Sequence, residues 1–210
     1  MHNQGNLNWD DYWKKDTKSS IFTLVRTKII ASSLSSTLEK YFPKTGKFVD
    51  CGSGSSETSI KILKHQRELI ALDLSKIALE KVKNNKKLPM TSTVNASIFD
   101  MPFQNESIDG IWNLGVMEHF HKEDILKILN EFNRVLKKDS YCILLWPAVY
   151  GPVNILFSFL GFFLRKQYFP DEVSLYNGKK WINNIVKDSK FKLVKVNWPL
   201  KGGLIYHEVI

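Results

Sequence analysis

Cysteine is scarce in this sequence: only Cys51 and Cys142 occur among 210 residues. Two cysteines, each inside a predicted strand, do not make the framework of a disulfide-rich secreted domain, and they favour a reduced, cytoplasmic setting. Residues 1–15 also lack the apolar core of a secretory signal. No stretch offers about 20 uninterrupted apolar residues, so the sequence predicts no membrane-spanning helix.

Acidic residues are outnumbered by basic ones. There are 21 Asp and Glu against 30 Lys and Arg, which gives a formal net charge of +9. Excess positive charge favours anionic partners such as nucleic acid, acidic lipid or phosphorylated small molecules. The lysines are scattered along the chain, however, and this favours the simpler explanation of a solvated basic surface. The length suits one domain with a small lid or insertion.

Strands and helices alternate through the middle of the chain. Strands are predicted at 47–51, 69–72, 91–96, 108–114 and 141–146, and helices at about 56–65, 75–84 and 122–137. This alternation predicts an α/β fold with a Rossmann-like, doubly wound, mostly parallel sheet. A short aromatic segment at 8–15 and a long helix from Ser19 or Ser20 to Phe42 precede it. A helix at 178–188 and strands at 192–198 and 204–210 follow; the short link between these strands predicts an antiparallel C-terminal hairpin that completes a seven-stranded sheet.

The chain is organised around residues 47–57, KFVDCGSGSSE. An apolar strand runs into Asp50 and then into a tight loop with Gly52 and Gly54. Glycines allow positive φ and remove the Cβ that would block a ligand. A strand–loop–helix unit also brings backbone N–H groups close to that ligand. The loop therefore predicts a nucleotide-like cofactor.

Asp73 ends the next predicted strand, about 20 residues after the loop. An acid at this place in a Rossmann-like unit accepts hydrogen bonds from ribose hydroxyls, which indicates an adenosine-containing ligand. The alternative is that Asp73 only caps Ser75 and its helix. A nicotinamide-binding loop would carry glycine where Glu57 stands, and the Gly-Lys-Ser/Thr of a P-loop is absent.

Three segments together resemble a known family. They are VDCGSGSS at 49–56, LIALDLS at 69–75 and FDMPFQNESIDGIWNLGVMEHF at 99–120. Their order and spacing over residues 47–146 resemble the class I S-adenosylmethionine-dependent methyltransferases, in the group of ubiquinone-type and other small-molecule enzymes. The resemblance implies a superfamily and a cofactor, not a substrate.

The resemblance assigns cofactor contacts by position, with S-adenosylmethionine as cofactor and S-adenosylhomocysteine as its product. The methionine end of the cofactor would be held by Asp50, Cys51, Gly52, Ser53 and Gly54, and the ribose would be bound by Asp73. Leu74 would contact the face of the adenine, and Ser97 and Ile98 would contact its edge. Asn113 and Leu114 would lie near the transferring methyl group. Two departures stand out: Ser56 replaces the third loop glycine, and Ser97 replaces the family's adenine-edge Asp. A hydroxyl still accepts a hydrogen bond, but losing the charged acceptor costs about 1–2 kcal/mol of affinity.

The candidates for proton transfer are Glu118 and His119, just beyond the fourth strand at the carboxyl edge of the sheet. A base is needed only if the acceptor must lose a proton, and a structural role for His119 in its loop is the alternative. Some quinone-type relatives carry acids and a histidine for a metal here. Because Leu114 and Gly115 stand where one such acid would be, no metal site is predicted.

Acceptor recognition is expected between the fifth strand and the last helix, where family members vary. Residues 147–172 are apolar and aromatic, and the run at 155–164 is followed by Arg165 and Lys166. One explanation is a lid that packs on its own domain. The other explanation is an apolar pocket for a lipid-like acceptor, or peripheral membrane contact through 152–166 that gives access to such an acceptor.

These features predict one methyltransferase domain over 1–210, with a helical cap at about 8–43 and a lid insertion at about 147–172. The predicted function is methyl transfer to a small-molecule or lipid-like acceptor by in-line displacement. One alternative is a catalytically silent cofactor-binding or scaffold protein. Another is a nucleic-acid methyltransferase, which the absence of an Asn/Asp-Pro-Pro-aromatic segment disfavours. We predict a cytoplasmic protein, peripheral at the membrane surface if 152–166 docks there.

Overall fold

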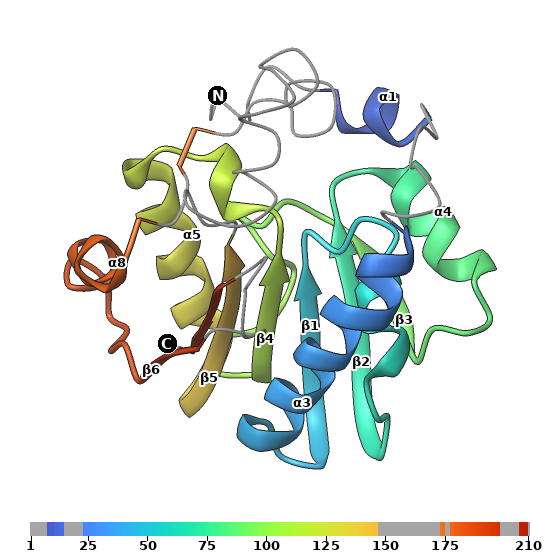
Figure 1. The fold of residues 1–210 in the computed structure, drawn as a ribbon, viewed down its shortest axis with the longest axis horizontal. Coiled ribbons are helices and arrows are strands. Elements are labelled where there is room, and N and C mark those ends of the chain that lie inside the picture. The colour runs from blue at the N-terminus through green and yellow to red at the C-terminus, as the bar shows by residue number, and fades with distance from the viewer. Residues whose placement is uncertain (1–7, 15–22, 147–172, 175–176, 198–205, 210) are drawn as a thin grey trace. The chain divides into compact units, whose positions relative to one another are not determined.

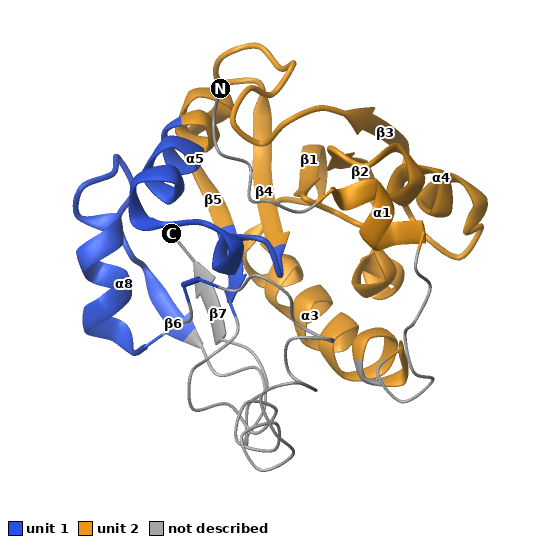
Figure 2. Ribbon diagram, turned by 90° about the horizontal axis from the view of Figure 1, so that it is seen from above, with its two compact units in different colours: residues 1–7, 114–130, 143–210 blue, residues 8–113, 131–142 orange. Residues whose placement is uncertain are grey.

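Figure 1 shows the fold of the computed structural model, which describes residues 8–14, 23–146, 173–174, 177–197 and 206–209. The chain divides into two compact units, coloured separately in Figure 2. Unit 2 comprises residues 8–113 and 131–142, and unit 1 comprises residues 1–7, 114–130 and 143–210.

Unit 2 is built on a parallel sheet. Its strands are β1 (Thr45–Cys51), β2 (Gln66–Asp73), β3 (Ser92–Asn95), β4 (Ile108–Leu114) and β5 (Leu136–Trp146), and the last two continue into unit 1. Their order is β3-β2-β1-β4-β5, with β1 parallel to both β2 and β4 and with β2 parallel to β3. The apolar centres of β1, β2, β4 and β5 are buried, as expected for parallel strands covered on both faces, whereas β3 has no buried residue. The predicted Rossmann-like α/β fold is confirmed.

The strand register aligns the polar ends of three strands. Asp50 of β1 pairs with Ala71 of β2 on one side and with Trp112 of β4 on the other. The carboxyl ends of β1, β2 and β4 therefore finish near one another at the same edge. Because β1 lies between strands that follow it in opposite directions along the sheet, this edge is a topological switch point, where open α/β sheets bind ligands.

The helices of unit 2 differ from the prediction in two places. The described part of the helix predicted to run to Phe42 contains a π-helix (η1, Val25–Ile30), which continues as α3 (Ala31–Tyr41). The helix predicted at 56–65 is wrong: the segment forms only a short 3₁₀ turn, η2 (Glu57–Lys61). Serine and threonine are weak helix formers, and the hydroxyl of Ser59 is donated to Asp50 instead of facing solvent. The remaining helices, α1 (Trp9–Lys14) and α4 (Lys76–Asn84), lie side by side.

Unit 1 begins where β4 ends. It contains the 3₁₀ turn η3 (Met117–His119), the start of α5 (Lys122–Val135), the end of β5, and then α8 (Lys179–Val186), β6 (Lys195–Asn197) and β7 (Tyr206–Val209). β7 pairs antiparallel with both β5 and β6. The link predicted to join the last two strands, 199–203, lies outside the described residues, so the complete C-terminal hairpin stays a prediction.

The predicted lid at 147–172, with its proposed membrane contact at 152–166, also lies outside the described residues, as do the proposed helix caps Ser19 and Ser20. Among the residues that are described, no helix is both long and apolar enough to cross a membrane. Cys51 and Cys142 are buried free thiols.

Candidate cofactor-binding site

Asp73 occupies the end of β2 and holds the glycine loop. One carboxylate oxygen, Oδ2, accepts the N–H of Gly54 at 2.7 Å, and the other, Oδ1, accepts the N–H of Ser75 at 2.8 Å. Burial raises the pKa of Asp73 above its ordinary value, although these two backbone hydrogen bonds act to lower it. Each carboxylate oxygen has a second lone pair. The side chain can therefore organise the loop and the next helix while still accepting hydrogen bonds from the two hydroxyls of a ribose.

Asp50 lies beneath the loop and is buried. Its Oδ2 accepts the hydroxyl of Ser56 at 2.6 Å and the hydroxyl of Ser59 at 3.0 Å. Burial raises the pKa of Asp50 to about 6, despite the opposing effect of the two serine hydrogen bonds. The negative charge of Asp73 acts in the same direction as burial. Near neutral pH this edge of the sheet therefore concentrates negative charge that neutral donors only partly offset.

Ser56 replaces the loop glycine without changing the backbone that a glycine would adopt. Its φ of 52° lies in the left-handed region. A non-glycine residue there costs about 1–2 kcal/mol, whereas a hydrogen bond from its hydroxyl to the carboxylate of Asp50 contributes about 1.5–3 kcal/mol. The serine thus offsets its own backbone strain.

The N–H groups of the loop do not point where the sequence predicted. Those of Gly52 and Ser53 are donated to the carbonyl of Leu72 at 2.8 and 3.0 Å, and that of Gly54 to Asp73. The expectation that they face the ligand is wrong for these three residues. They tie the loop to the end of β2 instead, so the loop presents backbone surfaces and side-chain acceptors to a ligand.

Asn113 ends the part of β4 that belongs to unit 2. Its amide nitrogen donates to the carbonyl of Cys51 at 2.7 Å, which places the side chain beside the start of the loop. Its Oδ1 is buried without a hydrogen-bond partner in the described structure, and so is the hydroxyl of Ser55. A buried polar atom without a partner costs about 1–3 kcal/mol. These two atoms fit a ligand that carries N–H or O–H donors, such as the methionine end of S-adenosylmethionine.

The predicted adenine-side residues are arranged around the end of β3. Leu74 is exposed, as a residue that contacts a bound base must be, whereas Ile98 is buried. The hydroxyl of Ser97 accepts the N–H of Phe99 at 3.2 Å, so one of its lone pairs serves its own turn. The amide of Asn95 donates to the carbonyls of Asp73 and Leu74 at 3.0 and 2.8 Å and fixes the backbone between them.

Three of these residues were not identified from the sequence. Asn95 has no motif around it, and Ser59 belongs to a segment that resembles an ordinary helix. Ser56 was noticed only as a departure from the family pattern. Its place at the third-glycine position was the available signal, because a hydroxyl there faces the acid of the preceding strand.

Glu118 and His119 belong to η3 in unit 1. Glu118 is buried and His119 is half-buried. The carbonyl of Glu118 accepts the N–H groups of Val173 and Ser174 at 2.7 and 3.0 Å. Leu114, half-buried, connects this unit to the end of β4. The proximity of Glu118 and His119 to a reacting methyl group stays a prediction. In the described parts of the chain, no group of three or more metal-ligating side chains is found.

Comparison with known proteins agrees with this geometry. Residues 49–144 match the model of a family described as a methyltransferase domain. This range includes both acids, the glycine loop and the η3 segment. No curated protein matches the chain at a significant level.

Solved structures share the fold at low identity. A Thermotoga maritima protein, described as a possible histamine N-methyltransferase, is 14% identical with a TM-score of 0.64 over 99% of this chain and 96% of its own. The 1,6-didemethyltoxoflavin N1-methyltransferase of Burkholderia thailandensis, solved with S-adenosylhomocysteine, is 14% identical with a TM-score of 0.58 over 95% and 79%. A possible exported protein of Bordetella parapertussis is 9% identical with a TM-score of 0.64, and the match covers 85% of this chain but 65% of that one.

The match to a methyltransferase-domain family over residues 49–144 is consistent with the class I S-adenosylmethionine-dependent methyltransferase that the sequence motifs implied. The predicted cofactor, S-adenosylmethionine, agrees with this match. The matched structures show the fold alone, so they assign neither an acceptor nor a role to any single residue of this chain.

Proposed function

We propose that this methyltransferase transfers a methyl group to a small-molecule or lipid-like acceptor. The use of S-adenosylmethionine as methyl donor is supported by the sheet edge that Asp50, Asp73 and Asn113 form. There, two buried acids and an unpartnered acceptor converge on the glycine loop. Such an edge suits a ligand that carries positive charge and hydrogen-bond donors, and S-adenosylmethionine carries both.

The chemistry asks the protein mainly for positioning. The cofactor supplies an activated methyl group on a sulfonium, and in-line displacement needs the acceptor aligned and water excluded. In this chain Asp73 would hold the ribose, and Asn113 would accept hydrogen bonds from the methionine end. Glu118 or His119 would take a proton from an acceptor that must lose one.

The acceptor class is inferred from the composition of segment 147–172 and from the contacts of two described residues that flank it. Ser174, just after it, donates its hydroxyl to the carbonyl of Met117 at 3.0 Å and its N–H to that of Glu118. Trp146, just before it, donates its indole N–H to the carbonyl of Ser174 at 2.7 Å. Two described residues that flank the apolar segment in sequence, Trp146 and Ser174, are therefore hydrogen-bonded to each other, and Ser174 is hydrogen-bonded to the turn that holds the candidate acid and base. The apolar composition of the segment favours an apolar acceptor.

A scan of acceptors tests this proposal. The purified protein is incubated with S-adenosylmethionine and with fractionated small-molecule, lipid, RNA or DNA extracts in separate reactions, and S-adenosylhomocysteine production is measured. We expect turnover with an apolar fraction, and we expect Ser174→Ala to lower kcat for that acceptor with little change in the KM for the cofactor. Turnover only with RNA or DNA would contradict the proposal.

We further propose a cytoplasmic protein that can reach lipid-linked acceptors at a membrane surface through 152–166. The +9 net charge and the basic pair after the apolar run support docking to anionic headgroups. Co-sedimentation with phosphatidylglycerol vesicles tests it, with neutral phosphatidylcholine vesicles as control. Equal recovery from both would count against docking.

A catalytically silent cofactor-binding protein is the second candidate. The hydroxyl of Ser97, already used by its own turn, favours it because the adenine edge is then held less firmly. Calorimetry separates the two: a silent protein binds S-adenosylhomocysteine but supports no turnover with any acceptor fraction. For the fold, we infer that β6 and β7 form the predicted C-terminal hairpin of a seven-stranded sheet, which their antiparallel pairing supports.

A further inference from the structure

The indole ring of Trp13, on α1, rests directly on the glycine loop. A Cβ atom added to Gly54 would lie 2.3 Å from Cζ2 and 2.8 Å from Cη2 of this ring. No side chain fits at Gly54 while Trp13 stays in place. The second loop glycine is therefore required by a contact inside the protein, in addition to the left-handed turn that its φ of 52° requires.

Asp10 fastens the same helix to the start of α4. Its Oδ1 accepts the hydroxyl of Ser75 at 2.6 Å and the N–H of Ile77 at 3.4 Å. The oxygen of Ser75 also accepts the N–H of Ala78 at 3.1 Å and so caps α4. Because the N–H of Ser75 is donated to Asp73, one serine links α1 to the acid assigned to the ribose.

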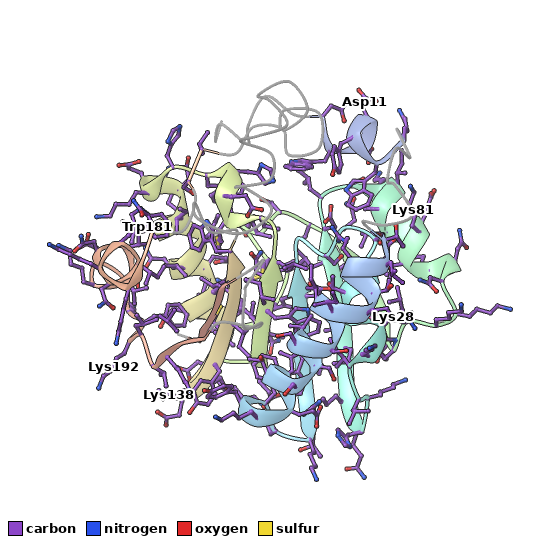
Figure 3. The ribbon with its side chains drawn as sticks, viewed as in Figure 1. Asp11, Lys28, Lys81, Lys138, Trp181 and Lys192 are labelled. Carbon is purple, nitrogen blue, oxygen red and sulfur yellow. The ribbon has the colours of Figure 1, made fainter. Side chains whose placement is uncertain are left out.

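A third contact lies one turn further along α4. The ammonium of Lys81 lies 5.7 Å from the centre of the Trp13 ring, within the range of a cation–π interaction. Figure 3 labels Lys81 on α4 and Asp11 on α1. A helix of six residues has little stability of its own, so contacts of this kind must hold it in place.

We propose that Trp13 forms a wall of the cofactor site and that Asp10 is the positioning residue that keeps it there. The inference rests on the proposed function, because it assigns these residues to the same cofactor. The contacts of α1 fall on Gly54, Ser75 and Ile77. The N–H groups of Gly54 and Ser75 both donate to the carboxylate of Asp73. A bound cofactor would be covered by the indole, and its release would require α1 to lift.

The test compares two neighbouring acids of α1. Asp10→Ala removes the bond to Ser75, whereas Asp11→Ala removes only an exposed ion pair with Lys14 at 3.1 Å. S-adenosylhomocysteine binding is measured by calorimetry and its dissociation by stopped-flow fluorescence. We expect Asp10→Ala to weaken binding and to speed dissociation about fivefold, the effect of losing one charged hydrogen bond at a partly exposed site. Asp11→Ala should stay within about twofold of the wild type.

A second pair of variants tests the ring itself. Trp13→Ala should weaken binding about tenfold or more, because an aromatic wall is lost, while Trp13→Phe should keep most of the affinity. Trp13→Phe should also lose a distinct part of the tryptophan fluorescence change on binding, a signal that a purely structural role would not move. Circular dichroism of each variant confirms folding.

The outcomes separate this inference from the proposed function. If the wild type binds S-adenosylhomocysteine but Asp10→Ala and Trp13→Ala bind and release it like Asp11→Ala, the inference is overturned and the proposed function stands. Tighter binding by Trp13→Ala also overturns it, because the indole would then block the site. If the wild type does not bind, the proposed function fails first.

Discussion

The two edges of the parallel sheet in unit 2 treat their acids differently. At the edge where the strands begin, Glu39 pairs with Arg67, and Asp109 pairs with Lys137 at 2.7 Å. At the edge where the strands end, Asp50 and Asp73 accept hydrogen bonds from serine hydroxyls and backbone N–H groups, which carry no charge. The acids at the first edge are therefore paired with cationic side chains, whereas Asp50 and Asp73 at the second edge accept hydrogen bonds from neutral groups.

The pKa directions follow this difference. Burial raises the pKa of Glu39, but its hydrogen bonds with Arg67 and His65 outweigh burial and hold that pKa below its ordinary value. Burial also raises the pKa of Asp50, to about 6, and no cation among the described residues reverses that shift. Acids whose pKa is shifted by burial and by a neighbouring charge cluster at functional sites. We infer that the acids at the edge where the strands begin stabilise the fold, and that the acids at the edge where the strands end bind a cationic ligand.

Replacing Arg67 should have the largest effect on stability. Its guanidinium is buried and donates to Glu39 and to the carbonyls of Phe42, Pro43 and Leu63. Arg67→Ala leaves these acceptors without a donor, and we expect the free energy of unfolding to fall by about 3–5 kcal/mol. Urea denaturation followed by circular dichroism measures it.

Lys137→Ala is the matched control, since it removes the exposed partner of Asp109 at the same edge. It should lower the free energy of unfolding by no more than about 1 kcal/mol. Equal effects of the two substitutions would mean that burial does not govern this edge. Affinity for S-adenosylhomocysteine should be unchanged in whichever of the two variants folds.

Substitutions in the glycine loop should have a smaller effect that depends on which group is lost. Ser56→Ala keeps the strained backbone and loses the bond to Asp50, so we expect a loss of about 2 kcal/mol. Ser56→Gly loses the bond but relieves the strain, and it should stay within about 1 kcal/mol of the wild type. Ser55→Ala removes a hydroxyl that has no partner and serves as the control. Thermal unfolding ranks the three variants, and a Ser56→Ala variant as stable as Ser55→Ala would contradict this account.

The smallest expected effect is on the pH dependence of cofactor binding. Below a pKa of about 6, Asp50 is protonated in the cofactor-free protein, and above it the carboxylate attracts the cationic groups of S-adenosylmethionine. Affinity should therefore rise as pH increases from 5 to 7, by about threefold to tenfold, because binding favours the ionised form.

Asp50→Asn should flatten that profile. Asp73, whose pKa is also raised, faces the same loop, and any slope left in the Asn variant reports on it. A wild-type profile without slope between pH 5 and 7, measured by calorimetry in buffers of equal ionic strength, would show that Asp50 does not sense the cofactor.

The sequence predicted those parts of the molecule that depend on local patterns. The strand at 108–114 has the predicted bounds, and the helix predicted at 75–84 forms as α4 with Ser75 as its cap, because apolar runs and capping residues act on their neighbours. Asp73 was found because its spacing from the glycine loop follows from the length of a βαβ unit.

What the sequence could not predict depends on contacts between distant residues. The helix expected at 56–65 is replaced by a short turn whose serine hydroxyls reach a buried acid on the preceding strand. The contact of Trp13 with Gly54 joins an aromatic segment that was expected only to cover the domain to the loop at its centre. The sequence around Ser59 or Trp13 does not indicate which distant residue each side chain contacts, so these contacts are known only from the structure.

The central claim is that the edge of the sheet where the strands end, with Asp50 and Asp73, is the cofactor site. Calorimetric titration with S-adenosylhomocysteine tests it most directly, using the wild type, Asp73→Ala, Asp73→Asn and His119→Ala. We predict that the wild type binds, that both Asp73 variants lose affinity by about 100-fold, as expected when two charged hydrogen bonds are lost, and that His119→Ala binds like the wild type. Wild-type affinity in the Asp73 variants would contradict the account.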